Sequence, residues 1–103
     1  MSLLNAIQTF QQIIREYQSC EQGIMEIVKK YYKSKKHFLS SVEGYKNSFS
    51  EVKLIYNMNE KNKRYAQCEG AYKTVVEDYE IICSMNERLT EKKMAIIDHF
   101  KFL

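Results

Sequence analysis

The sequence predicts an all-α fold, a long antiparallel helical hairpin of the coiled-coil type that completes a four-helix bundle by dimerisation. Three observations support this prediction. The 103 residues include no proline and only three glycines, so the chain lacks most of the residues that form the turns of a β-sandwich or β-barrel. Apolar residues recur with a helical period along two stretches of the chain. A polar segment rich in asparagine separates these two stretches.

The first predicted helix covers residues 3–56. Apolar or aromatic residues recur there at alternating steps of four and three, interrupted by Glu21 and Lys35. The period of 3.5 residues is typical of one continuous helix in a coiled coil. The apolar positions of this first stripe are Leu3, Ile7, Phe10, Ile14, Tyr17, Ile24, Val28, Tyr31, Phe38, Val42, Tyr45, Phe49, Val52 and Tyr56.

A turn is predicted at residues 57–63, where the pattern loses its phase. This segment contains three asparagines, and asparagine suits turns and caps because its side chain bonds the nearby backbone. We expect Asn57 or Asn59 to cap the second helix, with Glu60 in its first turn. The alternative is a stutter within one unbroken helix.

The second predicted helix covers residues 64–102, and its apolar stripe is interrupted by Lys61, Asn86 and Lys93. The stripe runs to the last residue without a glycine or a polar cap, which favours a fragment of a longer helical protein. We therefore predict a single helical domain over residues 1–103. The apolar positions of this second stripe are Met58, Tyr65, Cys68, Tyr72, Val75, Tyr79, Ile82, Leu89, Ile96, Phe100 and Leu103.

A three-helix bundle with a break near residues 33–41 is the alternative architecture. The segment Ser40-Ser41-Val42-Glu43 resembles a capping box, the usual start of a new helix. The first stripe nevertheless passes through this region without losing phase, which favours the hairpin.

The polar positions of the two stripes provide an expected register for the hairpin. With a turn centred near residue 60, Lys35 lies opposite Asn86, and Glu21 lies opposite His99. Polar residues in the seam of a coiled coil cost stability but fix register. We expect Glu21, Lys35, Asn86 and Lys93 to set the register.

Further apolar residues flank both stripes, and the resulting face is broader than two helices can cover. We therefore expect the chain to form a homo-oligomer or to pack on another helical protein. The candidate self-association residues are Leu4, Ile13, Met25, Ile27, Val76 and Ile97.

The tyrosines lie mostly on the two stripes. We interpret them as core rings whose hydroxyl groups reach the edge of a slender hairpin. An aromatic cleft for a cofactor or ligand is the alternative interpretation.

No catalytic, cofactor or metal site is expected. The glycines are isolated, so no phosphate-binding loop is formed, and no Glu-x-x-His motif of a di-metal bundle occurs. His37 and Cys83 supply at most two of the four ligands that a metal site needs. The acidic group Glu77, Asp78 and Glu80 is interpreted as a solvated face. We predict a protein that is not an enzyme.

Cys20, Cys68 and Cys83 are odd in number and form no Cys-x-x-Cys motif. This pattern indicates reduced thiols and a cytoplasmic protein. The N-terminus does not resemble a secretory signal, and no apolar run approaches the roughly 20 residues of a membrane span.

A basic segment, Lys29–His37, carries no acidic residue, although the whole chain has a formal charge of only +3. It is a candidate for binding an anionic membrane or an acidic partner, unless it pairs with Glu87 and Glu91 of the facing helix. Nucleic acid is not expected as a partner, because the charge is low and no recognition motif occurs. The candidate residues in this segment and at the hairpin tip are Lys29, Lys30, Lys33, Lys36, Lys61, Lys63 and Arg64.

Two family resemblances rest on length, helical form and charge. The chain is similar in length and form to small secreted helical hairpins with a Trp-x-Gly turn, but it has no tryptophan and Glu43-Gly44 lies within the first stripe. Long helices with a basic patch and a basic tip also resemble part of a membrane-bending BAR-type domain. A complete BAR-type domain is about twice as long, and neither resemblance carries a motif.

These observations predict a scaffold module that acts by self-association or by binding a coiled-coil partner. The alternative is a peripheral membrane-binding helical module that uses the basic segment Lys29–His37.

Overall fold

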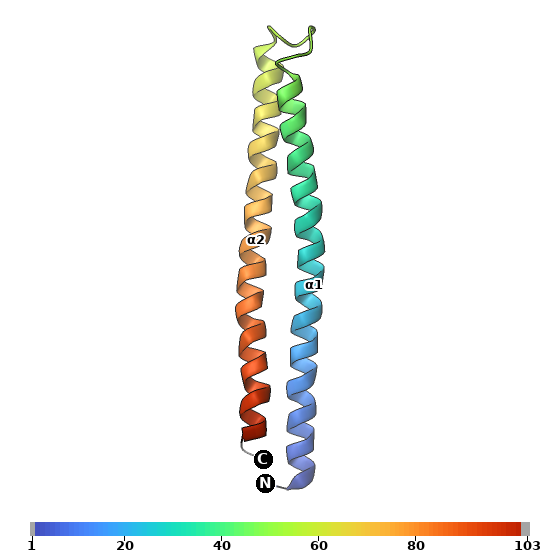
Figure 1. The fold of residues 1–103 in the computed structure, drawn as a ribbon, viewed down its shortest axis with the longest axis vertical. Helices are drawn as coiled ribbons and strands as arrows, with labels where there is room; N and C mark the ends of the chain where they lie inside the picture. The colour runs from blue at the N-terminus through green and yellow to red at the C-terminus, as the bar shows by residue number, and fades with distance from the viewer. Residues whose placement is uncertain (1, 102–103) are drawn as a thin grey trace. The chain divides into compact units, whose positions relative to one another are not determined.

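The computed structural model describes residues 2–101, which form two long helices and no strand. Helix α1 spans Leu3–Asn47 and helix α2 spans Met58–Lys101, joined by a loop at residues 48–57 (Figure 1). The prediction of an all-α helical hairpin is confirmed.

The chain divides into two compact units. Unit 1 consists of Met1–Val28 and Ile81–Leu103, and unit 2 consists of Lys29–Glu80. In each unit a part of α1 runs antiparallel to a part of α2, and the connecting loop belongs to unit 2 (Figure 1). The organisation of residues 1–103 as a single domain stays a prediction.

Helix α1 ends at Asn47, so the predicted end near residue 56 is wrong. The backbone N–H of Ser48 donates to the Tyr45 carbonyl at 3.1 Å, which tightens the last turn, and the Ser48 hydroxyl donates to the same carbonyl at 2.6 Å. Ser48 is fully buried, so these bonds satisfy the helix end where water has no access. Val52 and Tyr56 continue the apolar period but lie in the loop, 85% and 94% exposed.

Helix α2 begins at Met58, so the predicted turn at residues 57–63 is also wrong. The Glu60 backbone N–H donates to Asn57 Oδ1 at 3.0 Å, which makes Asn57 the N-cap. Glu60 lies in the first turn, and the expected cap is thereby confirmed. The predicted helix end at residue 102 and the stripe residue Leu103 lie outside the described residues.

Helix α1 continues without a break through residues 33–41, so the alternative three-helix architecture is wrong. The Ser41 hydroxyl donates to the His37 carbonyl one turn earlier, at 3.0 Å. Because this hydroxyl is used within the helix, it does not cap a new one.

The seam of α2 follows the predicted stripe at every second position, and between these positions it uses the residue that precedes the predicted one. The confirmed positions, which are buried or partly buried, are Cys68, Val75, Ile82, Leu89 and Ile96. Ala71 and Asp78 are buried, at 7% and 2% exposure, whereas the next residues, Tyr72 and Tyr79, are 57% and 56% exposed. On α1, Cys20 and Ser34 are partly buried in place of the exposed stripe residues Glu21 and Lys35. Asn86 and Lys93 are exposed as well. The four polar residues that were expected to set the register therefore do not lie in the seam.

The register itself differs from the predicted one by about three helical turns. His99 stacks on Phe10, with ring centroids 5.3 Å apart, and therefore does not lie opposite Glu21 as predicted. Ser34, next to Lys35, donates a hydrogen bond to Asp78, so this part of α1 lies beside Asp78 and not beside Asn86 as predicted. The cause is the early end of α1, which moves the turn toward the N-terminus.

In unit 1 the helices approach closely at Gly23. A Cβ atom at this position would lie 2.8 Å from Met85 Cε, so glycine leaves room for the methionine. The Cys20 thiol lies 3.8 Å from the Met85 carbonyl, and Lys92 Nζ lies 3.2 Å from Glu16 Oε2. These contacts pair the first part of α1 with the last part of α2.

Candidate interaction surfaces

Three aromatic pairs bridge α1 and α2 on one side of unit 2. Their ring centroids are 5.5–6.2 Å apart, in the pairs Tyr31–Tyr79, Phe38–Tyr72 and Tyr45–Tyr65. Successive pairs are seven residues apart on each helix, about 10.5 Å along the axis. We call these six residues the aromatic ladder.

The α2 members of the aromatic ladder are half exposed because each one follows a seam residue. A step of one residue turns a side chain by about 100° around a helix, from the seam to its edge. Tyr65, Tyr72 and Tyr79 are accordingly 50%, 57% and 56% exposed. The sequence interpretation of these tyrosines as core rings is therefore wrong for α2. Their rings pack against α1 on one side and meet solvent on the other.

Asp78 is the buried charge of unit 2, which contradicts its interpretation as part of a solvated face. Its Oδ2 accepts a hydrogen bond from the Ser34 hydroxyl at 2.6 Å, and its Oδ1 lies 3.3 Å from Lys30 Nζ. The Ser34 hydrogen bond and then the Lys30 ammonium hold the pKa of Asp78 below its ordinary value, against the opposing effect of burial. The sign of this burial in the sequence is the spacing of Asp78, three residues after Val75 and four before Ile82, which both belong to the predicted second stripe.

A groove of about 490 Å³ lies beside this buried carboxylate in unit 2. Small residues form part of its lining, and Lys33 and His37 bring basic side chains to it from α1. The lining residues are Lys33, Ser34, His37, Gln67, Gly70, Ala71 and Thr74.

The basic segment Lys29–His37 is divided by the structure. Lys30 pairs with Asp78, and not with Glu87 or Glu91. Lys29, Lys33 and Lys36 are exposed, and none of them has an ion pair within residues 2–101. These three lysines share one face of α1 and leave their charge to solvent.

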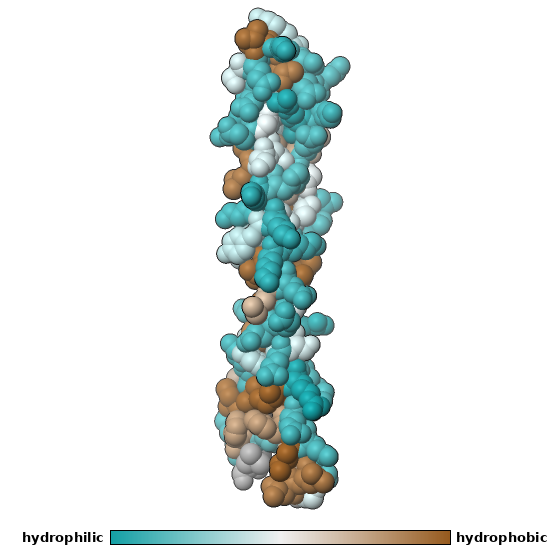
Figure 2. All heavy atoms as spheres, turned by 90° about the vertical axis from the view of Figure 1, so that its right-hand side faces the viewer, coloured by the Kyte–Doolittle hydropathy of each residue, from teal (hydrophilic) through white to brown (hydrophobic). Residues whose placement is uncertain are grey.

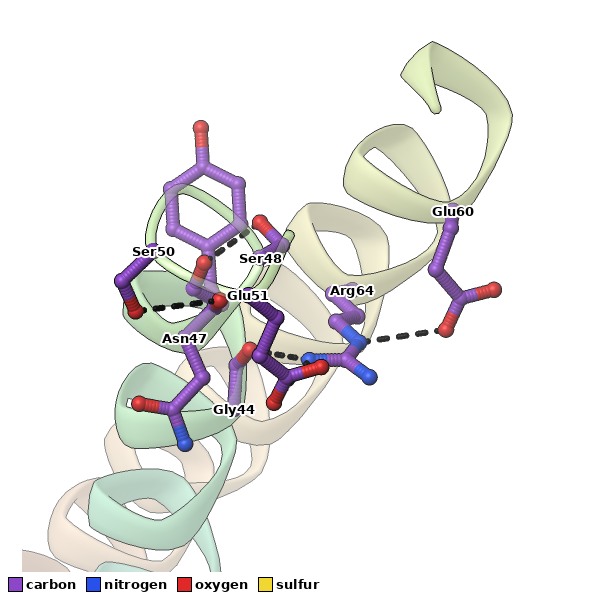
Figure 3. Close-up of polar contacts among 8 residues, drawn as sticks. Gly44, Asn47, Ser48, Ser50, Glu51, Glu60 and Arg64 are labelled. Atoms are coloured by element: carbon purple, nitrogen blue, oxygen red, sulfur yellow. Dashed lines mark hydrogen bonds and ion pairs between the residues drawn. The ribbon is translucent and has the colours of Figure 1, made fainter. Parts of the chain in front are cut away.

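The basic residues at the hairpin tip are mostly engaged in holding the loop. Arg64 Nη1 donates to the Gly44 carbonyl at 2.7 Å, and Arg64 Nε donates to Glu60 Oε1 at 3.1 Å (Figure 3). The first of these bonds ties the start of α2 to the end of α1.

Lys61 and Lys63, the other two basic residues at the tip, differ in whether they contact the loop. Lys61 Nζ donates to the Ile55 carbonyl at 2.5 Å and lies 4.6 Å from the centre of the Phe49 ring. Lys63 is exposed. Of the three candidate residues at the tip, Lys63 is the one that these loop contacts leave out.

The candidate self-association residues fall into two groups. Leu4, Met25 and Ile97 are 64%, 52% and 47% exposed. The others, Ile13, Ile27 and Val76, are partly buried. Figure 2 shows apolar side chains gathered at the end of unit 1 where α1 begins and α2 ends. Exposed apolar residues of this region are Leu3, Leu4, Ile7, Met94, Ile97 and Phe100.

The described part of the chain offers no cluster of three or more His, Cys, Asp or Glu side chains that could hold a metal ion. The cysteines are free, with Cys68 buried, Cys20 partly buried and Cys83 exposed. Neither α1 nor α2 has a stretch that is both long and apolar enough to cross a membrane.

Comparison with protein-family models, with curated proteins and with solved structures finds no match for this chain. The two family resemblances stay interpretations of length, form and charge.

Proposed function

We propose that this chain is a non-enzymatic helical interaction module that acts by packing its exposed apolar residues on another helical surface, with a homodimeric four-helix bundle as the simplest product. The observation that carries the proposal is the small interior. Within residues 2–101, the buried residues are Ser48, Cys68, Ala71 and Asp78, of which two are apolar.

The apolar residues that the helices do not cover supply the driving force. Among the residues that the structure describes, eighteen large apolar or aromatic side chains are at least 37% exposed, and they include Leu3, Leu4, Met25, Tyr32 and Leu39. Burial of such a side chain contributes about 1.5–3 kcal/mol when it is complete. Contiguous exposed apolar patches on a soluble domain are typical of interaction sites.

Sedimentation velocity of the purified chain from about 1 to 200 μM tests this proposal directly. We expect the sedimentation coefficient to rise with concentration toward that of a dimer or larger oligomer. A chain that stays monomeric over the whole range would contradict self-association, and a helical partner would then have to supply the second surface.

The second candidate function is binding to an anionic membrane surface. It is favoured by the exposure of Lys29, Lys33 and Lys36, which lack ion pairs within the described residues. Each basic side chain near such a surface contributes about 1 kcal/mol.

Co-pelleting with phosphatidylserine vesicles separates this function from the first. We expect the triple variant Lys29→Glu, Lys33→Glu, Lys36→Glu to lose pelleting. A control with the same change in net charge replaces three exposed lysines elsewhere, Lys46, Lys53 and Lys73, by Glu. Equal losses in both variants, or no loss in the first, would remove the basic segment as a membrane site.

A further inference from the structure

We propose that the partner of the aromatic ladder is a second copy of this chain, related by a two-fold axis parallel to the helices. In this arrangement α1 of one copy lies on α2 of the other. The inference rests on the proposed function and adds to it the surface and the orientation of the dimer.

The spacing of the aromatic ladder fits a second ladder without any shift. The pairs Tyr31–Tyr79, Phe38–Tyr72 and Tyr45–Tyr65 repeat every seven residues on both helices. A two-fold axis parallel to the helices keeps every pair at its own height, so each pair meets its counterpart in the other copy. Half-exposed tyrosines suit such an interface, because they bring a large apolar ring and a hydroxyl that reaches its edge.

The charges of unit 2 select the orientation. Residues 29–37 of α1 contain five lysines and no acid, whereas residues 69–80 of α2 contain four acids and one lysine. The ion pair between Lys30 and Asp78 places these two stretches at the same height. With α1 on α2 of the partner, a basic stretch lies beside an acidic stretch twice. With α1 on α1, basic lies beside basic, which is unfavourable.

The opposite side of unit 2 is less suited to a dry interface. Its groove is lined by Lys33, His37, Gln67 and Thr74, whose polar groups would lose water on burial. On the side of the aromatic ladder the residues along the seam are mainly aromatic rings. Burying these rings costs less free energy of desolvation than burying the polar groups of the groove.

A substitution in the middle of the ladder tests the surface. We expect Tyr72→Ser to weaken the dimer by tenfold or more in sedimentation equilibrium, since central aromatic residues dominate binding. The matched control is Tyr56→Ser, the same replacement at a loop tyrosine that is 94% exposed. Circular dichroism reports whether the helices persist, because Tyr72 also packs on Phe38. A helical Tyr72→Ser variant that dimerises as well as the Tyr56→Ser variant would overturn the proposal.

A charge exchange tests the orientation without changing the ladder. We expect Lys35→Glu to weaken the dimer severalfold, because Lys35 lies one turn after Tyr31 on the side of the aromatic ladder and its replacement then repels the acidic stretch of the partner. Adding Glu69→Lys, one turn after Tyr65 on the same side, restores opposite charges and returns the formal charge to +3, the value of the unchanged chain. We expect this double variant to regain most of the lost affinity.

The outcomes separate this inference from the proposed function. Recovery in the double variant supports the arrangement with α1 on α2. Absence of recovery, or equal dimerisation of all charge variants, overturns the orientation while self-association stands. A monomeric unchanged chain overturns self-association and this inference with it, and leaves packing on a different helical partner as the proposed function.

Discussion

Lys30 Nζ lies 3.3 Å from Asp78 Oδ1 and joins the two helices of unit 2 across their seam. The two side chains differ sharply in environment, since 60% of the Lys30 side chain is exposed but only 3% of the Asp78 side chain. The pair is therefore anchored by a buried carboxylate, which also accepts the Ser34 hydrogen bond. A charge in this position tolerates few alternative registers, because a slipped helix would leave it buried without partners.

Replacement of Asp78 by alanine is expected to lower the free energy of unfolding by about 1–3 kcal/mol. The change removes a charged hydrogen-bond acceptor and leaves the partly buried Ser34 hydroxyl without its partner. Urea denaturation followed by circular dichroism at 222 nm measures the difference. Glu77→Ala is the control, because Glu77 is exposed and its loss should change stability by less than about 0.5 kcal/mol.

Acid is expected to destabilise the fold through the same carboxylate. The pKa of Asp78 in the folded chain is below its ordinary value of 3.8, so the unfolded chain binds this proton more readily. Its contribution to stability is present above about pH 4 and is lost as the pH falls through the folded-state pKa. Urea titrations between pH 6 and pH 2.5 should show a steeper loss for the unchanged chain than for Asp78→Ala. Parallel curves would show that Asp78 is not linked to folding.

The N-cap of α2 provides a comparison between two nearby asparagines. Asn57→Ala is expected to cost about 1 kcal/mol of stability, because the Glu60 backbone N–H loses its bond to Asn57 Oδ1. Asn59→Ala should have a much smaller effect, since Asn59 lies within α2 and is exposed. Thermal unfolding of both variants decides the point, and equal costs would argue against Asn57 as the cap.

Arg64 is expected to stabilise the junction between the loop and the helices by about 1–2 kcal/mol, because its guanidinium bonds both the Gly44 carbonyl and the Glu60 carboxylate. Arg64→Ala should therefore lower the urea midpoint and speed protease cleavage within residues 48–57. Lys63→Ala removes one positive charge from an exposed neighbour and serves as the control. A similar cleavage rate in the two variants would show that Arg64 does not hold the loop.

Period and composition were sufficient to predict two long helices, because α1 and α2 each follow a heptad pattern for many turns. Local backbone chemistry was sufficient to predict Asn57 as a cap. The end of α1 was missed because Phe49, Val52 and Tyr56 continue the apolar period by their spacing alone. The buried Ser48 hydroxyl that satisfies the helix end leaves no periodic signal.

The choice of seam on α2 could not be made from hydrophobicity. Tyr72 and Tyr79 carry more apolar surface than Ala71 and Asp78, yet the smaller pair lies inside. Small side chains allow two helices to approach closely, while bulky rings fit better at the edge of a thin pair. The burial of Asp78 depends on Lys30 and Ser34, about 45 residues earlier in the chain. Because the predicted register was wrong by about three turns, it did not place either partner beside Asp78.

The order of the three aromatic pairs also implies a direction of folding. Their partners are separated by 20, 34 and 48 residues along the chain, in the order Tyr45–Tyr65, Phe38–Tyr72 and Tyr31–Tyr79. Closing the shortest of these segments loses the least chain entropy, and each further pair then extends an existing contact by one heptad per helix. Unit 2 is therefore expected to assemble from its loop outward, with the pair nearest the loop formed in the transition state and the pair farthest from it formed last.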